Sequence, residues 1–346
     1  MAGPTPPLVP NLAPVDGETQ AARALEVAFL GGPADLTREQ VEDLADVDPE
    51  ATRRLWRALG FADLEPGVPS LTEADAVALA TTGRLVREQG IDPRTAEALA
   101  RALGQAMGHL AAAQVETVVE VLSRDPELVR LARESPVTLV EEVLPLLQPV
   151  TGPMQELLLY VWRRHVVAGA QRALAGAGMP VAETALAVGF ADLVGWTSAT
   201  RDMGTAELAA LIETFESTAF DLVVSYGGRV VKTLGDEVLF TAPTARAGAR
   251  IGLALAGAFV ERGPVPPVRV GLAWGPALAR AGDVFGPVVN LASRCTSLAR
   301  PSTVLVERAF ARAVEGDGAF VLRPMSPRRV RGYDRLEVAV LRHGAA

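Results

Sequence analysis

The sequence is poor in cysteine, lysine and aromatic residues, and it lacks long apolar runs. Cys295 is the only cysteine among 346 residues, so no disulfide can form within the chain and a reducing compartment is expected. No apolar run reaches the roughly 18 residues of a membrane-spanning helix. Residues 1–15 are proline-rich and lack the features of a signal peptide, so we expect them to be disordered. We therefore expect a soluble, cytoplasmic protein without a transmembrane segment.

Charge is divided unevenly along the chain. The formal net charge is −8 at pH 7, but residues 1–180 carry −10 and residues 181–346 carry +2. Binding to a nucleic-acid backbone requires clustered basic side chains, so nucleic acid is not an expected partner of the acidic half. The nearly neutral second half can still hold one small anionic ligand.

The first half predicts an all-helical domain. Apolar residues recur at spacings of three and four, with Thr, Asp or Ser before several segments and Gly after several. We expect a helical domain over 16–153, followed by a linking helix and linker over 154–183. The expected helices are 37–47, 48–60, 72–90, 92–125, 136–150 and 152–176.

The second half, 184–342, predicts an α+β domain. Its expected elements are a strand at 185–193, a helix at 204–227, a strand pair at 228–242, a helix at 245–263, a strand at 266–275, a helix at 287–300 and a strand at 303–308. The order β-α-β-β-α-β is that of the ferredoxin-like fold, with further elements appended.

Two aspartates are expected at neighbouring strand ends. Asp192 ends the first predicted strand of this domain, and Asp236 lies at the turn of the predicted hairpin. Two carboxylates without a His or Cys cluster suit hard cations such as Mg²⁺ or Mn²⁺. The turn 193–199, LVGWTSA, has backbone N–H groups that could hold phosphates. Together these features indicate a nucleoside triphosphate, although each aspartate taken singly is more simply a turn residue or a cap.

Lys232 is the only lysine, since all other members of the 33 Lys+Arg residues are arginine. Lysine is a compact point donor on a flexible stem, whereas arginine is a rigid planar fork. A site that needs one ammonium donor explains why lysine stands four residues before Asp236. Neutral drift is the alternative explanation for this residue taken alone.

Three motifs resemble the catalytic domain of class III adenylate/guanylate cyclases: FADLVGWT at 190–197, VVKTLGDEVLF at 230–240 and DVFGPVVNLASR at 283–294. The resemblance covers about 184–342 and implies a βαββαβ core, a role for ATP and two Mg²⁺ or Mn²⁺ ions per site. It also implies roles for six residues: Asp192 and Asp236 bind the metals, Lys232 and Asp283 recognise the purine, Asn290 orients the ribose, and Arg294 stabilises the transition state.

The chemistry of these residue types agrees with the resemblance. Adenine offers an acceptor at N1 and a donor at its amino group, so a Lys donor with an Asp acceptor fits adenine. Asn290 and Arg294 are four residues apart and share one helix face. The family resolves the distance between base and phosphates by a head-to-tail homodimer, in which one protomer supplies the aspartates and its partner the other four residues. The segment 276–282 is shorter than the corresponding arm of many members, and Pro287 replaces a common acidic residue.

The helical half resembles the regulatory region of soluble actinobacterial adenylate cyclases that respond to pH or fatty acids. The stretch YVWRRHVVAG, 160–169, carries this likeness, and His165 is a candidate regulatory residue because histidine titrates near neutral pH. An ordinary surface histidine is the alternative. The sequence predicts an adenylate cyclase that converts ATP to 3′,5′-cyclic AMP and pyrophosphate. The alternative is a nucleotide-binding signalling module without turnover.

Overall fold

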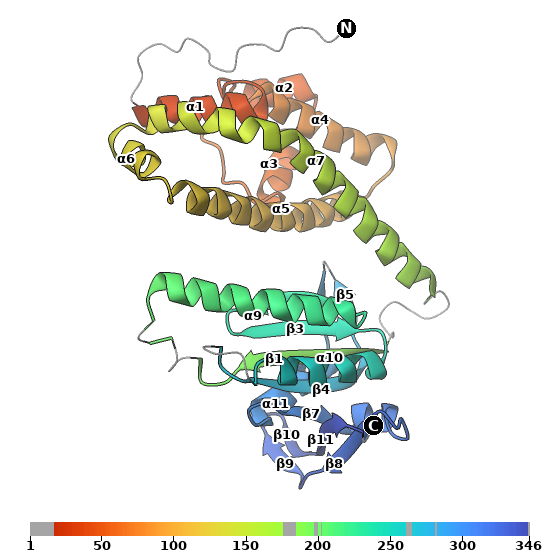
Figure 1. The fold of residues 1–346 in the computed structure, drawn as a ribbon. Helices are drawn as coiled ribbons and strands as arrows, with labels where there is room; N and C mark the ends of the chain where they lie inside the picture. The colour runs from red at the N-terminus through yellow and green to blue at the C-terminus, as the bar shows by residue number, and fades with distance from the viewer. Residues whose placement is uncertain are drawn as a thin grey trace. The chain divides into compact units, whose positions relative to one another are not determined.

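The computed structural model describes residues 17–175, 185–196, 200–201, 203–260, 265–280 and 282–344. The chain divides at Val166 into two compact units, one helical and one α+β, which are described separately below (Figure 1). This division lies within the predicted linking segment. The expected disorder of residues 1–15 and the predicted linker after the helix end fall outside the described residues. Among the described helices, none is long and apolar enough to cross a membrane.

The helical unit contains two long helices, α5 and α7, and five shorter ones among the described residues. The helices are α1 (Gly17–Leu30), α2 (Arg38–Ala45), α3 (Pro49–Ala58), α4 (Glu73–Glu88), α5 (Pro93–Leu122), α6 (Pro126–Glu134) and α7 (Pro136–Ala175). Several begin as the sequence indicates, with a Thr or Asp side chain accepting a hydrogen bond from a backbone N–H of the first turn. The sequence analysis missed α1 and α6.

Helix α7 differs from the prediction. Two helices were expected, at 136–150 and 152–176, but one helix of 40 residues runs through Pro145, Pro149 and Pro153. A proline inside a helix removes one N–H donor and usually breaks or kinks it. These three are spaced by four, so their missing donors lie along one side of the helix. The Thr151 hydroxyl donates to the Leu147 carbonyl at 3.0 Å, which supports the turn between two of them.

The α+β unit is built on a seven-stranded sheet with the order β2-β3-β1-β4-β7-β11-β8. Its elements are β1 (Ala185–Leu193), α9 (Thr205–Ser225), β2 (Arg229–Leu234), β3 (Glu237–Ala242), α10 (Ala245–Ala258), β4 (Val268–Pro276), β5 (Leu278–Arg280), β6 (Asp283–Phe285), α11 (Pro287–Leu298), β7 (Val304–Glu307), α12 (Arg308–Ala313), β8 (Phe320–Pro324), β9 (Arg328–Val330), β10 (Tyr333–Leu336) and β11 (Val338–His343). The order β2-β3-β1-β4, antiparallel throughout, confirms the ferredoxin-like core. The hairpin β5–β6 and helix α12 were not predicted.

Alternation along β1 divides the side chains between two cores. Ala187 and Ala191 belong to the larger cluster, which includes buried residues of α9 and α10. Val188 and Phe190 belong to a smaller cluster with residues of α11. Successive strand residues point to opposite faces, so Asp192 lies on the same face as Val188 and Phe190. The sheet therefore carries α9 and α10 on one face and α11 on the other. Asp192 lies on the face that α11 covers.

Candidate active site

The end of β1 meets the turn of the β2–β3 hairpin. Asp192 is paired in register with Glu237, and the Leu193 N–H donates to the Asp236 carbonyl at 3.0 Å. Gly235 adopts a φ of 67°, which glycine tolerates and which allows the tight turn. The hairpin thus brings Asp192 and Asp236 together, as the sequence predicted, and adds a third carboxylate beside them.

Asp192 is held by an arginine on the neighbouring strand. Arg269 lies directly opposite it in the β1–β4 register and donates from Nε at 2.6 Å and from Nη2 at 2.5 Å to the same oxygen, Oδ2. The Asp192 side chain is 13% exposed. Burial raises the pKa of Asp192 and the charge of Asp236 adds to this, so the pKa stays above its ordinary value although Arg269 opposes the shift.

Glu237 adds a third carboxyl group to the cluster. Burial raises its pKa to about 7, and the charges of Asp192 and Asp236 act in the same direction. Three carboxylates therefore face one guanidinium group. Within the described part of the chain, no group of three or more His, Cys, Asp or Glu side chains is arranged to hold a metal ion. The oxygen donors of the two aspartates and the surplus of negative charge nevertheless fit a hard divalent cation that takes its other oxygens from substrate and water.

Lys232 and Asp283 form a direct ion pair. The Lys232 Nζ lies 2.5 Å from Asp283 Oδ2, although the two residues are 51 positions apart. The Val284 N–H donates to Asp283 Oδ1 at 2.8 Å. Burial would raise the pKa of Asp283, but these two hydrogen bonds together lower it below its ordinary value. Arg229 Nη1 donates to the Gly282 carbonyl at 2.9 Å, which fastens the β5–β6 hairpin to β2 beside the pair.

Asn290 and Arg294 lie on α11. This helix begins after Gly286, whose φ of 135° suits glycine, and it packs against β4 and β1. Asn290 is exposed and Arg294 is half-buried. Neither side chain forms a hydrogen bond or ion pair with the residues that the structure describes. The structure therefore does not join them to the other four predicted residues within one chain.

Two other predictions concern His165 and the turn at 193–199. His165 is exposed on α7, and its regulatory role stays a prediction. Gly195, in the predicted phosphate-binding turn, has a φ of 75°. The rest of that turn, 197–199, lies outside the described residues.

Sequence reasoning missed Arg269 and Glu237. Arg269 is the only charged residue in the apolar strand 268–274, and that isolation is a signal that could have identified it. Its partner could not be identified in the same way, because the β1–β4 register joins residues 77 positions apart. Glu237 is part of the Gly-Asp-Glu sequence of the second motif, but only its burial distinguishes it from an ordinary turn residue.

Comparisons with known proteins identify the class. The family of the adenylate and guanylate cyclase catalytic domain matches residues 181–343. An adenylate cyclase of Streptomyces coelicolor is 43% identical over 296 residues, covering 85% of this chain and 76% of that protein. An adenylate cyclase of Glutamicibacter nicotianae is 36% identical over 333 residues, covering 91% and 80%. A pH-sensitive adenylate cyclase of Mycobacterium tuberculosis is 32% identical over 306 residues, covering 86% and 75%.

The chain belongs to the adenylate and guanylate cyclase catalytic domain family. The resemblance inferred from three motifs is thereby confirmed, and the chain is an enzyme of the class III cyclases. These relatives align with more of the chain than the catalytic domain alone, so their similarity extends into the helical unit.

Proposed function

We propose that the protein is an adenylate cyclase that converts ATP to 3′,5′-cyclic AMP and pyrophosphate. The observation that carries this proposal is the Lys232–Asp283 pair, at 2.5 Å, in a chain with no other lysine. Relatives 36% and 43% identical that are named adenylate cyclase support the same substrate.

The pair suits adenine because of its hydrogen-bonding atoms. Lys232 donates to N1, and Asp283 accepts from the adjacent amino group. Guanine presents a donor and an acceptor in the reverse order on this edge, so it would place donor against donor. An unmatched buried polar group costs about 1–3 kcal/mol, which is enough to separate the two bases. The lowered pKa of Asp283 keeps its carboxylate ionised and able to accept.

Asp192 and Asp236 would hold two divalent ions of the Mg²⁺ or Mn²⁺ class. When bound, such ions acidify the ribose 3′-hydroxyl and offset the charge of the triphosphate. Asp192 and Asp236 supply the fixed oxygen donors, and the buried strand β1 sets their position. Arg269 offsets part of the carboxylate charge and keeps Asp192 in one orientation. The cluster thereby stays ordered in spite of its surplus negative charge.

Asn290 and Arg294 act from α11. Their spacing of four places both side chains on one side of the helix. Asn290 would hydrogen-bond the ribose and hold the 3′-hydroxyl in line with the α-phosphorus. Arg294, always charged, would donate to oxygens on which negative charge grows as the bond to pyrophosphate breaks. Neither side chain has a partner among the described residues of its own chain, which leaves both available for a nucleotide.

The active sites are composite and lie between two copies of the chain. Lys232 and Asp236 flank one hairpin, yet they serve the base and the phosphates, which are opposite ends of ATP. One protomer would supply Asp192 and Asp236, and its partner Lys232, Asp283, Asn290 and Arg294. Two equivalent sites per homodimer follow from the symmetry.

Mixing two inactive variants tests both the dimer and the assignment. Asp192→Ala and Asn290→Ala chains should each make little cyclic AMP from ATP and Mn²⁺. Their mixture should recover activity, because one of the two sites in a mixed dimer is intact, and up to about a quarter of wild-type activity is expected if the chains mix at random. A mixture of Asp192→Ala with Asp236→Ala is the matched control and should stay inactive, since both changes fall in the same half-site.

Failure to recover activity in the first mixture would contradict the composite site. The alternative function, a nucleotide-binding module without turnover, would be supported if the wild-type chain bound ATP but formed no cyclic AMP at any protein concentration.

The helical unit is proposed to regulate the catalytic unit through the segment around 154–176, with protons or fatty acids as effectors and His165 as one candidate. Removal of residues 1–180 should change specific activity or its pH profile. Unchanged values of both would rule out this regulation.

A further inference from the structure

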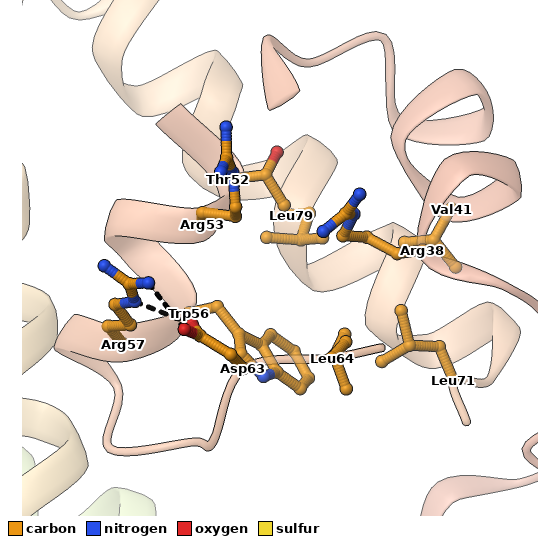
Figure 2. Close-up of a pocket in the computed structure, with 10 residues that line it drawn as sticks. All are labelled: Arg38, Val41, Thr52, Arg53, Trp56, Arg57, Asp63, Leu64, Leu71 and Leu79. Atoms are coloured by element: carbon orange, nitrogen blue, oxygen red, sulfur yellow. Dashed lines mark hydrogen bonds and ion pairs between the residues drawn. The ribbon is translucent and has the colours of Figure 1, made fainter. Parts of the chain in front are cut away.

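A cavity of about 140 Å³ lies inside the helical unit (Figure 2). It is lined by residues of α2, α3 and α4 and by the segment that connects α3 to α4. Its apolar wall consists of Val41, Trp56, Leu64, Leu71 and Leu79. All five belong to the small buried core of this unit or pack against it. Arg53, Arg57 and Asp63 are exposed, so the cavity has an apolar floor and is open to solvent at its charged rim.

Three arginines and one aspartate also line the cavity. Arg57 is paired with Asp63 through two hydrogen bonds, at 2.6 and 2.5 Å. The hydrogen bond from Arg57 lowers the pKa of Asp63, and the charges of Arg53 and Arg38 act in the same direction. Asp63 offsets the charge of Arg57, and Glu39 and Glu42 pair with Arg38. Among the three arginines, only Arg53 has no ion pair with the described residues.

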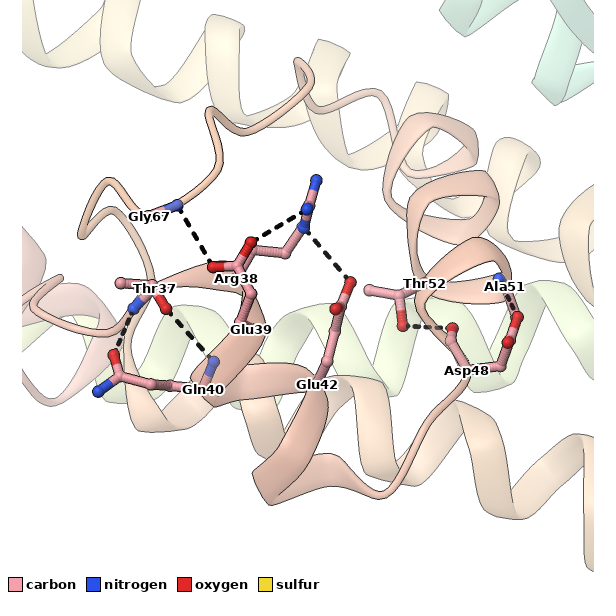
Figure 3. Close-up of polar contacts among 9 residues, drawn as sticks. All are labelled: Thr37, Arg38, Glu39, Gln40, Glu42, Asp48, Ala51, Thr52 and Gly67. Carbon is pink, nitrogen blue, oxygen red and sulfur yellow. Dashed lines mark hydrogen bonds and ion pairs between the residues drawn. The ribbon is translucent and has the colours of Figure 1, made fainter.

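Arg53 and Arg38 are the two arginines that Asp63 does not pair. Arg53 forms no hydrogen bond or ion pair with the described residues. Arg38 donates from Nη2 to Glu39 at 3.0 Å, but its Nε is buried and has no hydrogen-bond partner (Figure 3). Nε forms an ion pair with Glu42 Oε1 at 3.5 Å, drawn as a dashed line in Figure 3, but neither atom has a hydrogen-bond partner.

A buried donor without a partner is costly and rare in folded proteins. Glu42 is 7% exposed, and burial raises its pKa although the charge of Arg38 opposes the shift. Arg38 lines the cavity and its guanidinium end points toward Leu79 in Figure 2, so a bound anion would accept from its terminal nitrogens and not from Nε. An arginine matches a carboxylate particularly well, because its planar fork donates two parallel hydrogen bonds.

The size and the apolar wall define the rest of the ligand. A cavity of about 150 Å³ holds one benzene ring. The ring of Trp56 lies beside Leu64, and Leu79 lies between Arg38 and Arg53 in the view of Figure 2. A flat or branched apolar body with a single carboxylate satisfies both halves of this lining, whereas a long acyl chain exceeds the volume.

We propose that this cavity is a binding site for a small aromatic or branched carboxylic acid in its anionic form. The carboxylate lies between Arg38 and Arg53, and the apolar body packs against Trp56 and Leu79. None of the residues that line this cavity belongs to the six assigned to the nucleotide site.

The site is tested by measuring the binding of benzoate to the full chain with titration calorimetry. Benzoate should bind saturably, with one site per chain. Benzamide, which is isosteric and uncharged, should bind at least about tenfold more weakly. Arg53→Gln should weaken benzoate binding by a similar factor. Arg54→Gln is the matched control, because Arg54 neighbours Arg53 but pairs with Glu50 and Glu97 and does not line this cavity.

The proposal is overturned if benzoate does not saturate, if benzamide binds as well as benzoate, or if Arg54→Gln weakens binding as much as Arg53→Gln. Arg53 is exposed, so its variant should fold even where Arg38→Gln does not. Trp56→Phe gives a second measurement: the fluorescence change on benzoate binding should be lost with Trp56. Hexadecanoate should not displace benzoate, and displacement would overturn the size limit.

Discussion

The two units of this chain place their side chains by different physical means. In the α+β unit, one cluster of 27 buried residues fills the space between the sheet and its helices. In the helical unit, the corresponding cluster has five members, and the 30-residue helix α5 buries only Ala100. Large apolar side chains such as Leu99, Leu103 and Val115 are more than half exposed.

The helical unit relies instead on local interactions. Side-chain caps begin most of its short helices, and ion pairs such as Arg57–Asp63 and Arg130–Glu127 lie at its surface. Each of these interactions is individually weak, because the groups that form it are exposed to solvent. A unit with little buried area and many local contacts opens at lower free energy than a unit with a large core. The difference separates a unit that is held by one large core from a unit that is held mainly by local contacts.

The largest expected effect concerns two glycines that allow close packing, one in each unit. A Cβ atom at Gly271 would lie 2.1 Å from the Thr296 nitrogen and 2.4 Å from the Ala292 carbonyl oxygen. Gly271→Ala must therefore push α11 away from β4. We expect a loss of about 3 kcal/mol in the free energy of unfolding, measured by urea denaturation, and a fall in cyclase activity because α11 carries Asn290 and Arg294.

Gly275→Ala is the matched control on the same strand, because its new Cβ would lie 3.7 Å from Val288, an ordinary contact. It should change stability by less than about 1 kcal/mol. Gly104→Ala is the counterpart in the helical unit, where the Cβ would lie 2.2 Å from the Leu59 carbonyl oxygen. With fewer contacts to hold α3 against α5, the helical unit should relax at smaller cost. An equal loss from Gly104→Ala and Gly271→Ala would contradict the comparison.

The next effect concerns a buried carboxylate of the α+β unit. The pKa of Glu237 is about 7 in the folded chain against an ordinary 4.5, so between these values the native state binds more protons than the unfolded state. Its contribution to stability is complete below pH 4.5 and is lost as the pH rises to 7. Glu237→Gln stays neutral, so in metal-free buffer at pH 8 it should be more stable than wild type by about 2 kcal/mol.

At pH 4 the Glu237→Gln and wild-type chains should unfold at nearly the same denaturant concentration. Glu213→Gln, at an exposed position on α9, is the control and should show no such dependence on pH. A stability difference that is constant from pH 4 to pH 8 would show that the pKa of Glu237 is not raised.

Much of the fold was predictable because its patterns are local. Apolar periodicity predicted the helices α2 to α5 and the order of the sheet core, and the capping residues predicted where several helices start. The continuity of α7 was not predictable, because proline is normally a break and its tolerance depends on spacing and on neighbouring contacts. The β5–β6 hairpin was missed because its strands have only three residues each.

Site residues that belong to a sequence motif could be predicted. Contacts that depend on how two strands pair could not. The resemblance named Lys232 and Asp283, and the structure brings them into contact. The contact between Asp192 and Arg269 depends on the β1–β4 register, which no local pattern specifies. The raised pKa of Glu237 depends on burial by strands distant in sequence. The roles of Asn290 and Arg294, which the proposal assigns to a site between two chains, remain predictions.

The smallest effect compares two helix caps, one in each unit. Thr72 begins α4, where its hydroxyl accepts from the Asp75 N–H and the Asp75 carboxylate accepts from the Thr72 N–H at 2.7 Å. Thr244 begins α10 and accepts from the Ala247 N–H at 3.1 Å. Alanine at either position should cost about 1 kcal/mol.

The same loss should have different consequences, measured by amide hydrogen exchange in the full chain. In wild type, the amides of α4 should exchange much faster than those of α10, because eight residues of α10 are buried against the large core and only two of α4 are buried. Thr72→Ala should accelerate exchange in α4 by about fivefold. Thr244→Ala should leave α10 slower than wild-type α4, since the core around Ile251 and Leu255 still has to open before its amides are exposed. Equal exchange rates in the two wild-type helices would show that the helical unit is as firmly packed as the α+β unit.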